Sequence, residues 1–575
     1  MITFHSDPNI AEQQMLAVIF YLTAFGYIDG NFDKSEKSYV RDYVGKLVVG
    51  RARAILGEKL DQHYADIERT INHFHLVIDE TQRQIEELFT ESVAEGESSE
   101  QFVLAKPKLR CFELFRRFDD KTRSQLLASV DDLMLADGTT HPNEEAFRRE
   151  LYKLLFVPVE VEDYDLAEVE PASEELSDAD LAEVEPGAVI ISTPKTLSPS
   201  LPDHPFFREF EYPYAKDKES FLVQAKADME LIDRVVATLE KQRAAGKGLL
   251  DTLSDFSSAA PGTRFLDGHV YADKPAQGER CELLVVGDLH GCYSCLKGAL
   301  LQADFFAKLS AYKSDPTQHP RPMVVLLGDY IDRGRFSYNG VLRTAMQLFV
   351  SEPDHVRMLR GNHEYYVEIN GRVLAPVRPC EAMNEIKDVA PTEVFARYMR
   401  LFEELPTAYA FDKTLFVHAG IPRDDTLAEK YTGLSSLNDP EIRFQMLWSD
   451  PSDADAIPID LQKANARFPF GRKQLKHFLN KLGVSTLVRG HESVAEGFRL
   501  VYDDPEAKLI TLFSAGGATN EDLPPEAAYR KVTPMALTIR HEGGVSEVAP
   551  FAIDYARYND PQYNAFFRDA LTESK

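Results

Sequence analysis

Cysteine, positive charge and long apolar runs are all scarce in this sequence of 575 residues. The five cysteines form an odd and sparse set, which is typical of proteins kept in a reducing cytosol, so a cytoplasmic protein is expected. The 64 lysines and arginines are outnumbered by 93 acidic residues, and the net charge of −29 argues against binding to nucleic acid or to an anionic membrane surface. The apolar run Met15–Ile28 is too short to span a bilayer, so we expect a core helix there and no membrane insertion.

Two further patterns are incomplete. The opening residues, MITFHSDPNIAEQQ, lack the basic region of a secretory signal, so none is expected. Cys292 and Cys295 form a C-x-x-C pair, but no second pair lies nearby in the sequence. Packing inside a helix is therefore favoured for these two cysteines over a zinc site or a redox role.

The length of the chain exceeds what one hydrophobic core supports, so two to four domains are expected. The clearest division is acidic: residues 160–185 hold twelve acidic residues and no basic one, and the heptapeptide DLAEVEP begins at both Asp165 and Asp180. Such a stretch repels itself and offers little apolar surface to bury. We predict an extended, disordered linker over residues 158–200, and we favour it over an acidic binding tail.

Residues 1–157 contain two similar helix–turn–helix patterns. Each has an Asp-Gly turn, then an acid, an aromatic residue and an arginine at fixed distances. The members of the two copies are Asp29, Glu36, Tyr39 and Arg41, and Asp137, Glu144, Phe147 and Arg149. The pair resembles the TerB-like tellurite-resistance fold, which implies an all-α domain whose acidic corners bind a metal ion or a protein partner. An equally supported alternative is that the acids only cap helices and form surface ion pairs.

The region after the linker predicts one amphipathic helix. Apolar residues recur there at helical spacing, namely Phe221, Ala225, Met229, Ile232, Val236 and Leu239. We expect this helix in a helical extension, residues 201–275, packed against the downstream domain, and we favour core packing over a coiled coil. The downstream domain is expected over residues 276–550, followed by a C-terminal tail over 551–575.

Five apolar strands in this downstream region end in polar residues next to glycine. The sequences are LLVVGDLHG, MVVLLGDYIDRG, VRMLRGNHE, TLFVHAGI and STLVRGHE. Because sites in α/β folds lie at the carboxyl ends of strands, these polar residues can converge on one crevice. The candidate metal ligands are Asp288, His290, Asp329, Asn362, His418 and His491. Oxygen and imidazole ligands without thiolate suit Mn, Fe or Zn, and Asp329 is the candidate that would bridge two ions.

In order and approximate spacing, the motifs GDLHG, GDYIDRG, RGNHE, HAGI, LWSDP, ARFPFG, RGHE and TLFSA resemble the phosphoprotein phosphatase (PPP) family of metallophosphoesterases. The resemblance covers about residues 280–520. It implies a mixed α/β fold, a β-sandwich flanked by helices, with two divalent metal ions, of which Mn2+ is favoured over Fe or Zn. The sequence SAGGATN after TLFSA, the HAGI motif and the stretch after Glu364 depart from the eukaryotic pattern and indicate a bacterial relative.

The resemblance also implies roles for single residues. Asp288, His290 and Asp329 would hold one metal ion. Asp329, Asn362, His418 and His491 would hold the other. His363 and Asp332 would form the acid pair, and Arg333 and Arg467 would bind the phosphate, since arginine offers bidentate donors to it.

The implied reaction is hydrolysis of phosphoserine or phosphothreonine in a phosphoprotein substrate. Two metal ions would neutralise the phosphoryl oxygens and lower the pKa of a shared water towards ~7, so that hydroxide attacks phosphorus while His363 protonates the leaving oxygen. The first hypothesis is a protein serine/threonine phosphatase with a regulatory N-terminal domain. The alternatives are a small-molecule phosphoesterase, such as a symmetrical dinucleoside tetraphosphate hydrolase, and a non-catalytic scaffold, which is disfavoured because every ligand position is filled.

Overall fold

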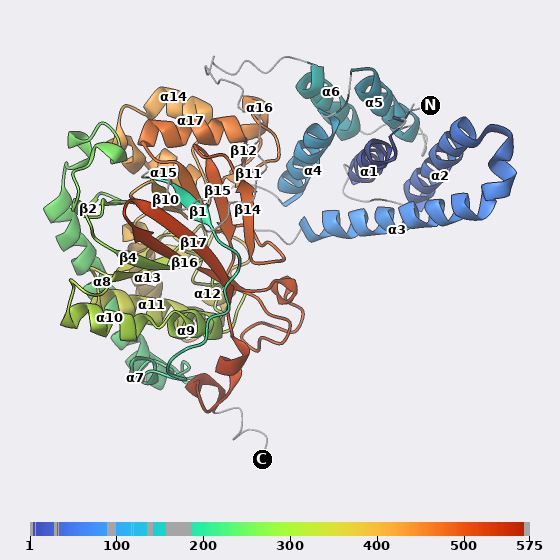
Figure 1. Ribbon diagram of the computed structural model, residues 1–575. Helices are drawn as coiled ribbons and strands as arrows, with labels where there is room; N and C mark the ends of the chain where they lie inside the picture. The colour runs from blue at the N-terminus through green and yellow to red at the C-terminus, as the bar shows by residue number, and fades with distance from the viewer. Residues whose placement is uncertain are drawn as a thin grey trace. The chain divides into compact units, whose positions relative to one another are not determined.

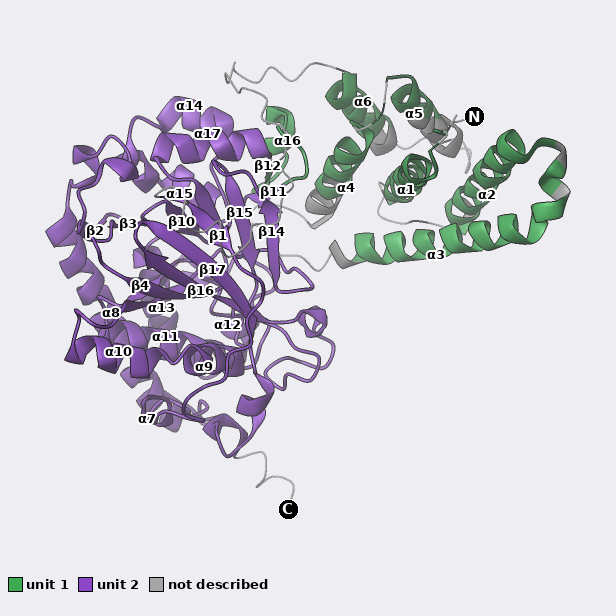
Figure 2. Cartoon of the chain, viewed as in Figure 1, with its two compact units in different colours: residues 1–164, 452–469 green, residues 165–451, 470–575 purple. Residues whose placement is uncertain are grey.

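The computed structural model describes residues 4–5, 7–27, 32, 34–88, 99–116, 118, 120–134, 142–156 and 187–568. The chain forms two compact units (Figure 2). The helical unit comprises residues 1–164 together with 452–469, and the α/β unit comprises residues 165–451 and 470–575. No helix in the described ranges is long and apolar enough to cross a membrane.

The helical unit is built around α1 (Pro8–Phe25), in agreement with the core helix expected there. Pro8 occupies the first helical turn, and the Asp7 side chain accepts hydrogen bonds from the backbone N–H groups of Asn9 and Ile10, so the sequence itself fixes where α1 begins. The other helices are α2 (Lys34–Leu56), α3 (Tyr64–Leu88), α4 (Ser99–Phe115), α5 (Asp120–Met134), α6 (Pro142–Phe156) and the short α16 (Ile459–Gln462). Both Asp-Gly turns lie outside the described residues, so the acidic corners stay a prediction.

Two sheets form the centre of the α/β unit (Figure 1). The first has the order β1-β17-β16-β4-β5-β6, and the second has the order β14-β15-β13-β10-β9-β3-β2. The strands of the first sheet are β1 (Val189–Ile191), β4 (Cys281–Val286), β5 (Arg321–Leu326), β6 (Val356–Met358), β16 (Met535–Glu542) and β17 (Val545–Ala552). Those of the second are β2 (Arg264–Asp267), β3 (Val270–Asp273), β9 (Ala408–Phe411), β10 (Thr414–Val417), β13 (Thr486–Arg489), β14 (Phe498–Tyr502) and β15 (Lys508–Leu512).

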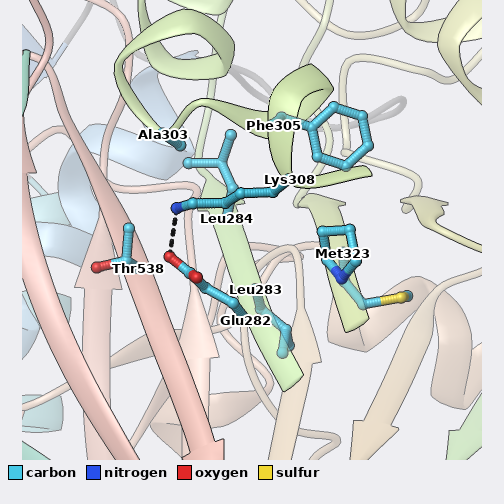
Figure 3. Close-up of a pocket in the computed structure, with 9 residues that line it drawn as sticks. Glu282, Leu283, Leu284, Ala303, Phe305, Lys308, Met323 and Thr538 are labelled. Atoms are coloured by element: carbon cyan, nitrogen blue, oxygen red, sulfur yellow. Dashed lines mark hydrogen bonds and ion pairs between the residues drawn. The ribbon is translucent and has the colours of Figure 1, made fainter. Parts of the chain in front are cut away.

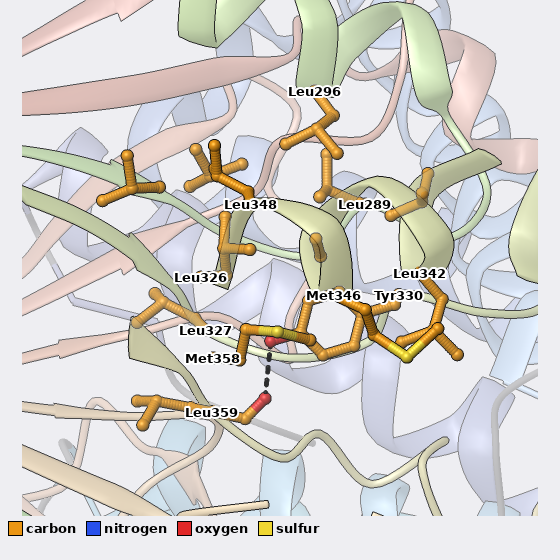
Figure 4. Close-up of a cluster of buried hydrophobic side chains, with 14 of the residues drawn as sticks. Leu289, Leu296, Leu326, Leu327, Tyr330, Leu342, Met346, Leu348, Met358 and Leu359 are labelled. Carbon is orange, nitrogen blue, oxygen red and sulfur yellow. Dashed lines mark hydrogen bonds between the residues drawn. The ribbon is translucent and has the colours of Figure 1, made fainter. Parts of the chain in front are cut away.

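One hydrophobic core joins the two sheets and their helices. Buried side chains of β4 and β5 share a cluster with those of β9, β10 and β15, which makes the unit a sandwich. The same cluster includes α9 (Tyr293–Gln302) and α11 (Arg343–Ser351) beside the first sheet (Figure 4). A second cluster covers the other sheet with α15 (Pro440–Met446) and α17 (Arg472–Leu482). The expected mixed α/β sandwich flanked by helices is therefore confirmed.

The strands that lead into the candidate site are the expected ones. β4 runs parallel to β5, and β5 runs parallel to β6, so their carboxyl ends lie at one edge of the first sheet. In the second sheet, β10 runs parallel to β13. All five strands are buried, as continuous apolar runs predict for a parallel arrangement.

The amphipathic helix after the linker is α8 (Lys218–Gly246), and its expected apolar face packs into the sandwich core. Three neighbouring segments differ from the sequence-based expectation. The extension 201–275 also contributes β2 and β3, residues 189–191 of the expected linker form β1 beside β17, and residues after 551 pack Ile553, Phe566 and Phe567 into the core. β3, β1 and the apolar residues after 551 find partners far away in the chain, whereas β2 pairs with the adjacent β3.

Candidate metal centre

Asp329 lies between two groups of possible metal ligands at the strand ends. On one side, the Nε2 atom of His290 is 3.4 Å from Asp329 Oδ2 and 3.9 Å from Asp288 Oδ2. On the other side, the Nε2 atom of His418 is 3.5 Å from Asp329 Oδ1. The two oxygens of one carboxylate therefore face two separate imidazoles, which is the arrangement expected of a carboxylate shared by two ions.

Asn362 and His491 complete the second group. The Oδ1 atom of Asn362 is 2.9 Å from His418 Nε2 and 3.1 Å from His491 Nδ1. His290, Asp329 and His363 form one buried cluster of potential ligands, and Asp329, His418 and His491 form a second. The six ligand candidates from the sequence thus come together in one place, although they come from five different strands.

The histidine tautomers fit a cation. His290 Nδ1 is 2.9 Å from the Ile331 carbonyl oxygen, and His418 Nδ1 is 3.1 Å from that of Leu327, so each Nδ1 carries the donated hydrogen. Each Nε2 is then left with a lone pair. The Nε2 of His418 is 2.9 Å from the Asn362 oxygen, and a cation bound between the two atoms would satisfy both lone pairs. The residues present therefore fit a metal ion.

Burial shifts the ionisation of these ligands towards neutral forms. Burial raises the pKa of Asp329 well above its usual value, and the nearby Asp288 carboxylate raises it further. Burial also raises the pKa of Asp288 to about 7. Burial lowers the pKa of His290 and that of His418 well below the usual value. Neutral imidazoles can donate a lone pair to a metal, and a divalent cation would reverse the unfavourable burial of the two carboxylates.

The backbone at the site is strained. Among the described residues, eight residues other than glycine have a positive φ, and five of them are site candidates: His290, Asp329, Asp332, Arg333 and His491. Each such conformation costs about 1–3 kcal/mol and persists only where the surroundings enforce it.

Glu364 supplies part of that enforcement. Its buried carboxylate accepts hydrogen bonds from the backbone N–H groups of Asp329, Tyr330 and Gly361, at 2.7, 2.9 and 3.0 Å. The bonds from Asp329 and Tyr330 tie the loop after β5 to the loop after β6, and the bond from Gly361 fixes Glu364 within its own loop. Gly361 is needed for this approach, since a Cβ atom there would lie 2.1 Å from Asp329 Oδ1.

His363 and Asp332 form a buried pair beside the first ligand group. His363 Nδ1 is 2.7 Å from Asp332 Oδ2, and the other Asp332 oxygen accepts a hydrogen bond from the backbone N–H of Ala382 at 2.9 Å. Burial raises the pKa of Asp332 to about 7, and the Ala382 N–H and the Arg333 charge oppose that rise. The pair occupies the position expected for an acid and its orienting carboxylate.

The two arginines proposed to bind phosphate have different settings. Arg333 directly follows Asp332, and its guanidinium carbon is 5.8 Å from the ring centroid of Tyr529. Arg467 is buried, with 7% of its surface exposed, and lies in the 452–469 segment of the helical unit. Its role in phosphate binding stays a prediction.

Tyr529 is a site residue that the sequence did not reveal. Its ring centroid is 5.4 Å from that of His290 and 5.0 Å from that of Phe513. It lies in a 3-10 turn, Ala528–Lys531, within the long loop between β15 and β16. The only signal was an aromatic residue in a loop that starts at the TLFSA motif, and nothing local indicated where that loop would fold.

Arg489 and Asp450 support the loop that carries His491. Arg489 donates to Asp450 Oδ1 at 2.9 Å, and that oxygen is 3.9 Å from His491 Nε2. Cys292 and Cys295 are fully buried at the start of α9, and burial raises the pKa of the Cys295 thiol far above its usual value, which fits packing rather than reactivity.

A small pocket elsewhere in the α/β unit has a different character (Figure 3). It is lined by residues of β4, β5, α10 (Phe305–Ser314) and Thr538, and Lys308 pairs across it with Glu282 at 2.5 Å. None of the candidate site residues lines it. It has neither the metal ligands nor the phosphate-binding arginines that the site chemistry requires.

Comparison with known proteins agrees with this geometry. The family model of calcineurin-like phosphoesterases matches residues 282–495. The chain is 29% identical over 258 residues to the serine/threonine-protein phosphatase BSL2 of Arabidopsis thaliana, covering 43% of this chain and 24% of that protein. It is 29% identical over 242 residues to a probable serine/threonine-protein phosphatase of Encephalitozoon cuniculi, covering 41% and 47%. It is also 29% identical over 238 residues to the serine/threonine-protein phosphatase 6 catalytic subunit of Caenorhabditis elegans, covering 40% and 63%.

The chain thus spans from about a quarter to under two thirds of the length of these relatives. Among solved structures, it is similar to a protein serine/threonine phosphatase of Saccharomyces cerevisiae, with a TM-score of 0.37 and 16% identity over 57% of this chain and 90% of that one. It is also similar to a purple acid phosphatase from yellow lupin, with a TM-score of 0.23 and 13% identity over 50% and 56%.

Proposed function

We propose that the chain hydrolyses phosphoserine and phosphothreonine in proteins, because residues 282–495 match the family model of calcineurin-like phosphoesterases and the similar proteins named above are serine/threonine-protein phosphatases. The observation that supports the proposal most is the position of Asp329. Its two carboxylate oxygens face two buried groups of candidate ligands, and the His363–Asp332 pair lies directly beside one of them.

In this proposal two divalent ions occupy the two groups. Asp288, His290 and Asp329 would hold one ion, and Asp329, Asn362, His418 and His491 would hold the other. Mn2+ is favoured, and Fe or Zn suits the same oxygen and imidazole ligands. When bound, the ions supply positive charge for the phosphoryl oxygens and lower the pKa of water.

The residues of the chain would perform the remaining steps. Arg333, together with Arg467, would orient the phosphate through bidentate hydrogen bonds. The Nδ1 atom of His363 is engaged by Asp332, so the Nε2 atom is the one available to hold a proton for the leaving oxygen. The Ala382 N–H and the carboxylate of Asp332 keep this ring oriented, which preserves the geometry between turnovers.

The test is a metal-reconstituted activity screen. Purified full-length protein is stripped of metal, loaded with Mn2+, and assayed with phosphoserine and phosphothreonine peptides and, in parallel, with a symmetrical dinucleoside tetraphosphate. We expect Mn2+-dependent release of phosphate from the peptides. Turnover of the dinucleotide with no turnover of the peptides would replace the proposal by the small-molecule reaction, and activity on neither substrate would refute both.

The helical unit has a regulatory role in this proposal. The resemblance of its two repeated sequence patterns to the TerB-like fold supports binding of a protein partner or a metal ion at the two predicted acidic corners. We also keep the cytoplasmic location and the bacterial origin as proposals, since the sparse cysteines and the departures from the eukaryotic motifs support them.

A further inference from the structure

Segment 452–469 belongs to the helical unit although the chain before and after it belongs to the α/β unit (Figure 2). The segment leaves the α/β unit after β11 (Asp450–Pro451) and returns at β12 (Pro469–Phe470), and these two short strands pair with each other. It contains α16 and the predicted phosphate ligand Arg467. A part of the sequence that matches the phosphoesterase family model therefore packs in the helical unit.

Polar side chains of α4 hold the first residues of this segment. The hydroxyl of Ser452 donates a hydrogen bond to Glu113 Oε1, and both residues are buried. Arg110 links the other oxygen of Glu113, at 3.1 Å, to the carboxylate of Asp453, at 3.5 Å. Arg116 donates to the backbone carbonyl of Asp453 at 3.4 Å. A buried carboxylate with two partners fixes its neighbours in position more firmly than exposed ion pairs do.

Apolar side chains hold the rest of the segment. Ala454, Ile457 and Leu461 are each at most 4% exposed, and all three belong to the same hydrophobic cluster as Phe112 and Phe115 of α4. Of the three residues only Leu461 lies in a helix, α16, and Ala454 and Ile457 are buried from the irregular stretch before it. The segment is therefore part of the core of the helical unit and not a loop on its surface.

The residues that flank the segment on both sides contact the loops of the second ligand group. At the first end, Asp450 accepts a hydrogen bond from Arg489 at 2.9 Å and lies 3.9 Å from the Nε2 atom of His491. Arg489 also donates to the carbonyl of Ala419, the residue after His418.

At the other end, Phe470 packs on the loop that follows β10. Its ring is so near Gly420 that a Cβ atom there would lie 2.4 Å from Phe470 Cε1. Gly420 is two residues after the predicted ligand His418. Proline stands at the junction on both sides, at Pro451 and Pro469, and its ring restricts φ there, which leaves each junction less backbone freedom than another residue would.

We propose that the helical unit positions the predicted metal ligands His418 and His491 through segment 452–469, with Glu113 as the positioning residue that fixes the segment. The inference rests on the proposed function, because it assigns a purpose to the second metal site. A shift of α4 moves Ser452, and Pro451 passes this shift to Asp450 and so to the Arg489–His491 corner. A partner or ion that binds to the helical unit can then affect the position of the metal ligands through the continuous backbone of segment 452–469.

The test compares variants of the full-length chain. In Glu113→Ala, the affinity for one of two Mn2+ ions, measured by equilibrium dialysis, should fall about tenfold, the lower end of the effect of removing an outer partner of a metal ligand. Hydrogen exchange of backbone amides should accelerate in residues 414–420 and 486–491. Ser452→Ala should reproduce both effects from the other partner, and Glu113→Gln, which keeps an oxygen acceptor, should restore them in part.

Glu150→Ala is the matched control. Glu150 lies on α6 of the same unit and pairs with Lys108 of α4 at the surface, so its loss perturbs α4 without removing the Ser452 contact. It should leave the Mn2+ affinity unchanged. If Glu113→Ala does not fold, Ser452→Ala, which removes a single hydroxyl, provides the same comparison.

The outcomes separate this inference from the proposed function. Faster exchange confined to residues 452–462, with Mn2+ affinity and exchange at 414–420 and 486–491 unchanged, would overturn the inference, because the segment would then be only a tether. A protein that binds Mn2+ but hydrolyses no phosphopeptide would overturn the proposed function. The Mn2+ affinity of the Glu113→Ala variant, measured by dialysis, would still test the inference. If the protein binds no Mn2+, hydrogen exchange in residues 414–420 and 486–491 tests the inference: faster exchange in Glu113→Ala supports it, and unchanged exchange overturns it.

Discussion

The assignment of His363 as the group that protonates the leaving oxygen can be tested by changing the leaving group. Serine leaves phosphate as an alkoxide, a strong base that must be protonated as the P–O bond breaks, whereas an aryl phosphate with an acidic phenol leaves without help. General acid catalysis contributes about 10²–10⁴-fold, or about 2.7–5.4 kcal/mol of barrier. His363→Asn should therefore lose about 10²–10⁴-fold in kcat on a phosphoserine peptide and much less on the aryl phosphate.

The structure indicates that this variant keeps its fold. Removing the imidazole leaves the Asp332 carboxyl without its 2.7 Å partner, but burial already raises the pKa of that carboxyl to about 7. The group can take up a proton near neutral pH and still accept the hydrogen bond from Ala382. The loss of activity should therefore be a loss of chemistry and not of stability, which thermal unfolding of the metal-loaded protein will show.

The assay measures kcat for both substrates at one pH, together with the metal content of each preparation by elemental analysis. His363 lies in one of the two ligand clusters, so equal metal content is the necessary control. Equal losses on peptide and aryl phosphate, at unchanged metal content, would mean that His363 acts on the phosphoryl group or the nucleophile. The role assigned to it here would then be wrong.

Three other predictions address the ligands and the linker. Asp329→Asn should lower both metal content and activity, because two ions need the shared anion between them; full metal occupancy would show that another residue bridges. Arg333→Lys should raise KM for phosphopeptides at least about tenfold with unchanged metal content, since lysine cannot form the bidentate contact; an unchanged KM would remove Arg333 from the phosphate site. Limited proteolysis should cut within residues 160–185 and leave an active protein whose two pieces elute together in size-exclusion chromatography, because segment 452–469 stays in the helical core; separate elution or a resistant linker would contradict this.

The strand ends could be predicted because each motif contains its own structural information. In LLVVGDLHG the apolar run gives the strand, the glycine gives the turn, and the polar residues after it must lie at the end of the strand. The helix α8 could be predicted for a similar reason, since its apolar positions repeat with helical spacing over several turns. Both predictions depend only on residues close together in the sequence, so they do not require knowledge of distant contacts.

The hairpin of β2 and β3 has a local signal in the sequence, a glycine at the turn. Asp267 and Val270 are paired, so Gly268 and His269 form a two-residue loop, and Gly268 has a φ of +59°. Glycine at the first position of such a loop is typical of a tight hairpin turn between two short strands. A long amphipathic helix precedes the hairpin, and the two strands are too short to stand out by alternation of apolar and polar residues.

The 452–469 segment could not have been placed from any local signal. The apolar character of Ala454, Ile457 and Leu461 indicates that these side chains are buried, and they are. The sequence does not indicate which of the two hydrophobic cores buries these side chains, because apolar side chains can be buried in either core. Motifs on both sides, LWSDP before the segment and ARFPFG at its end, indicated the phosphoesterase core. The cluster with Phe112 and Phe115 of α4 is a contact between residues more than three hundred positions apart, and only the folded chain reveals it.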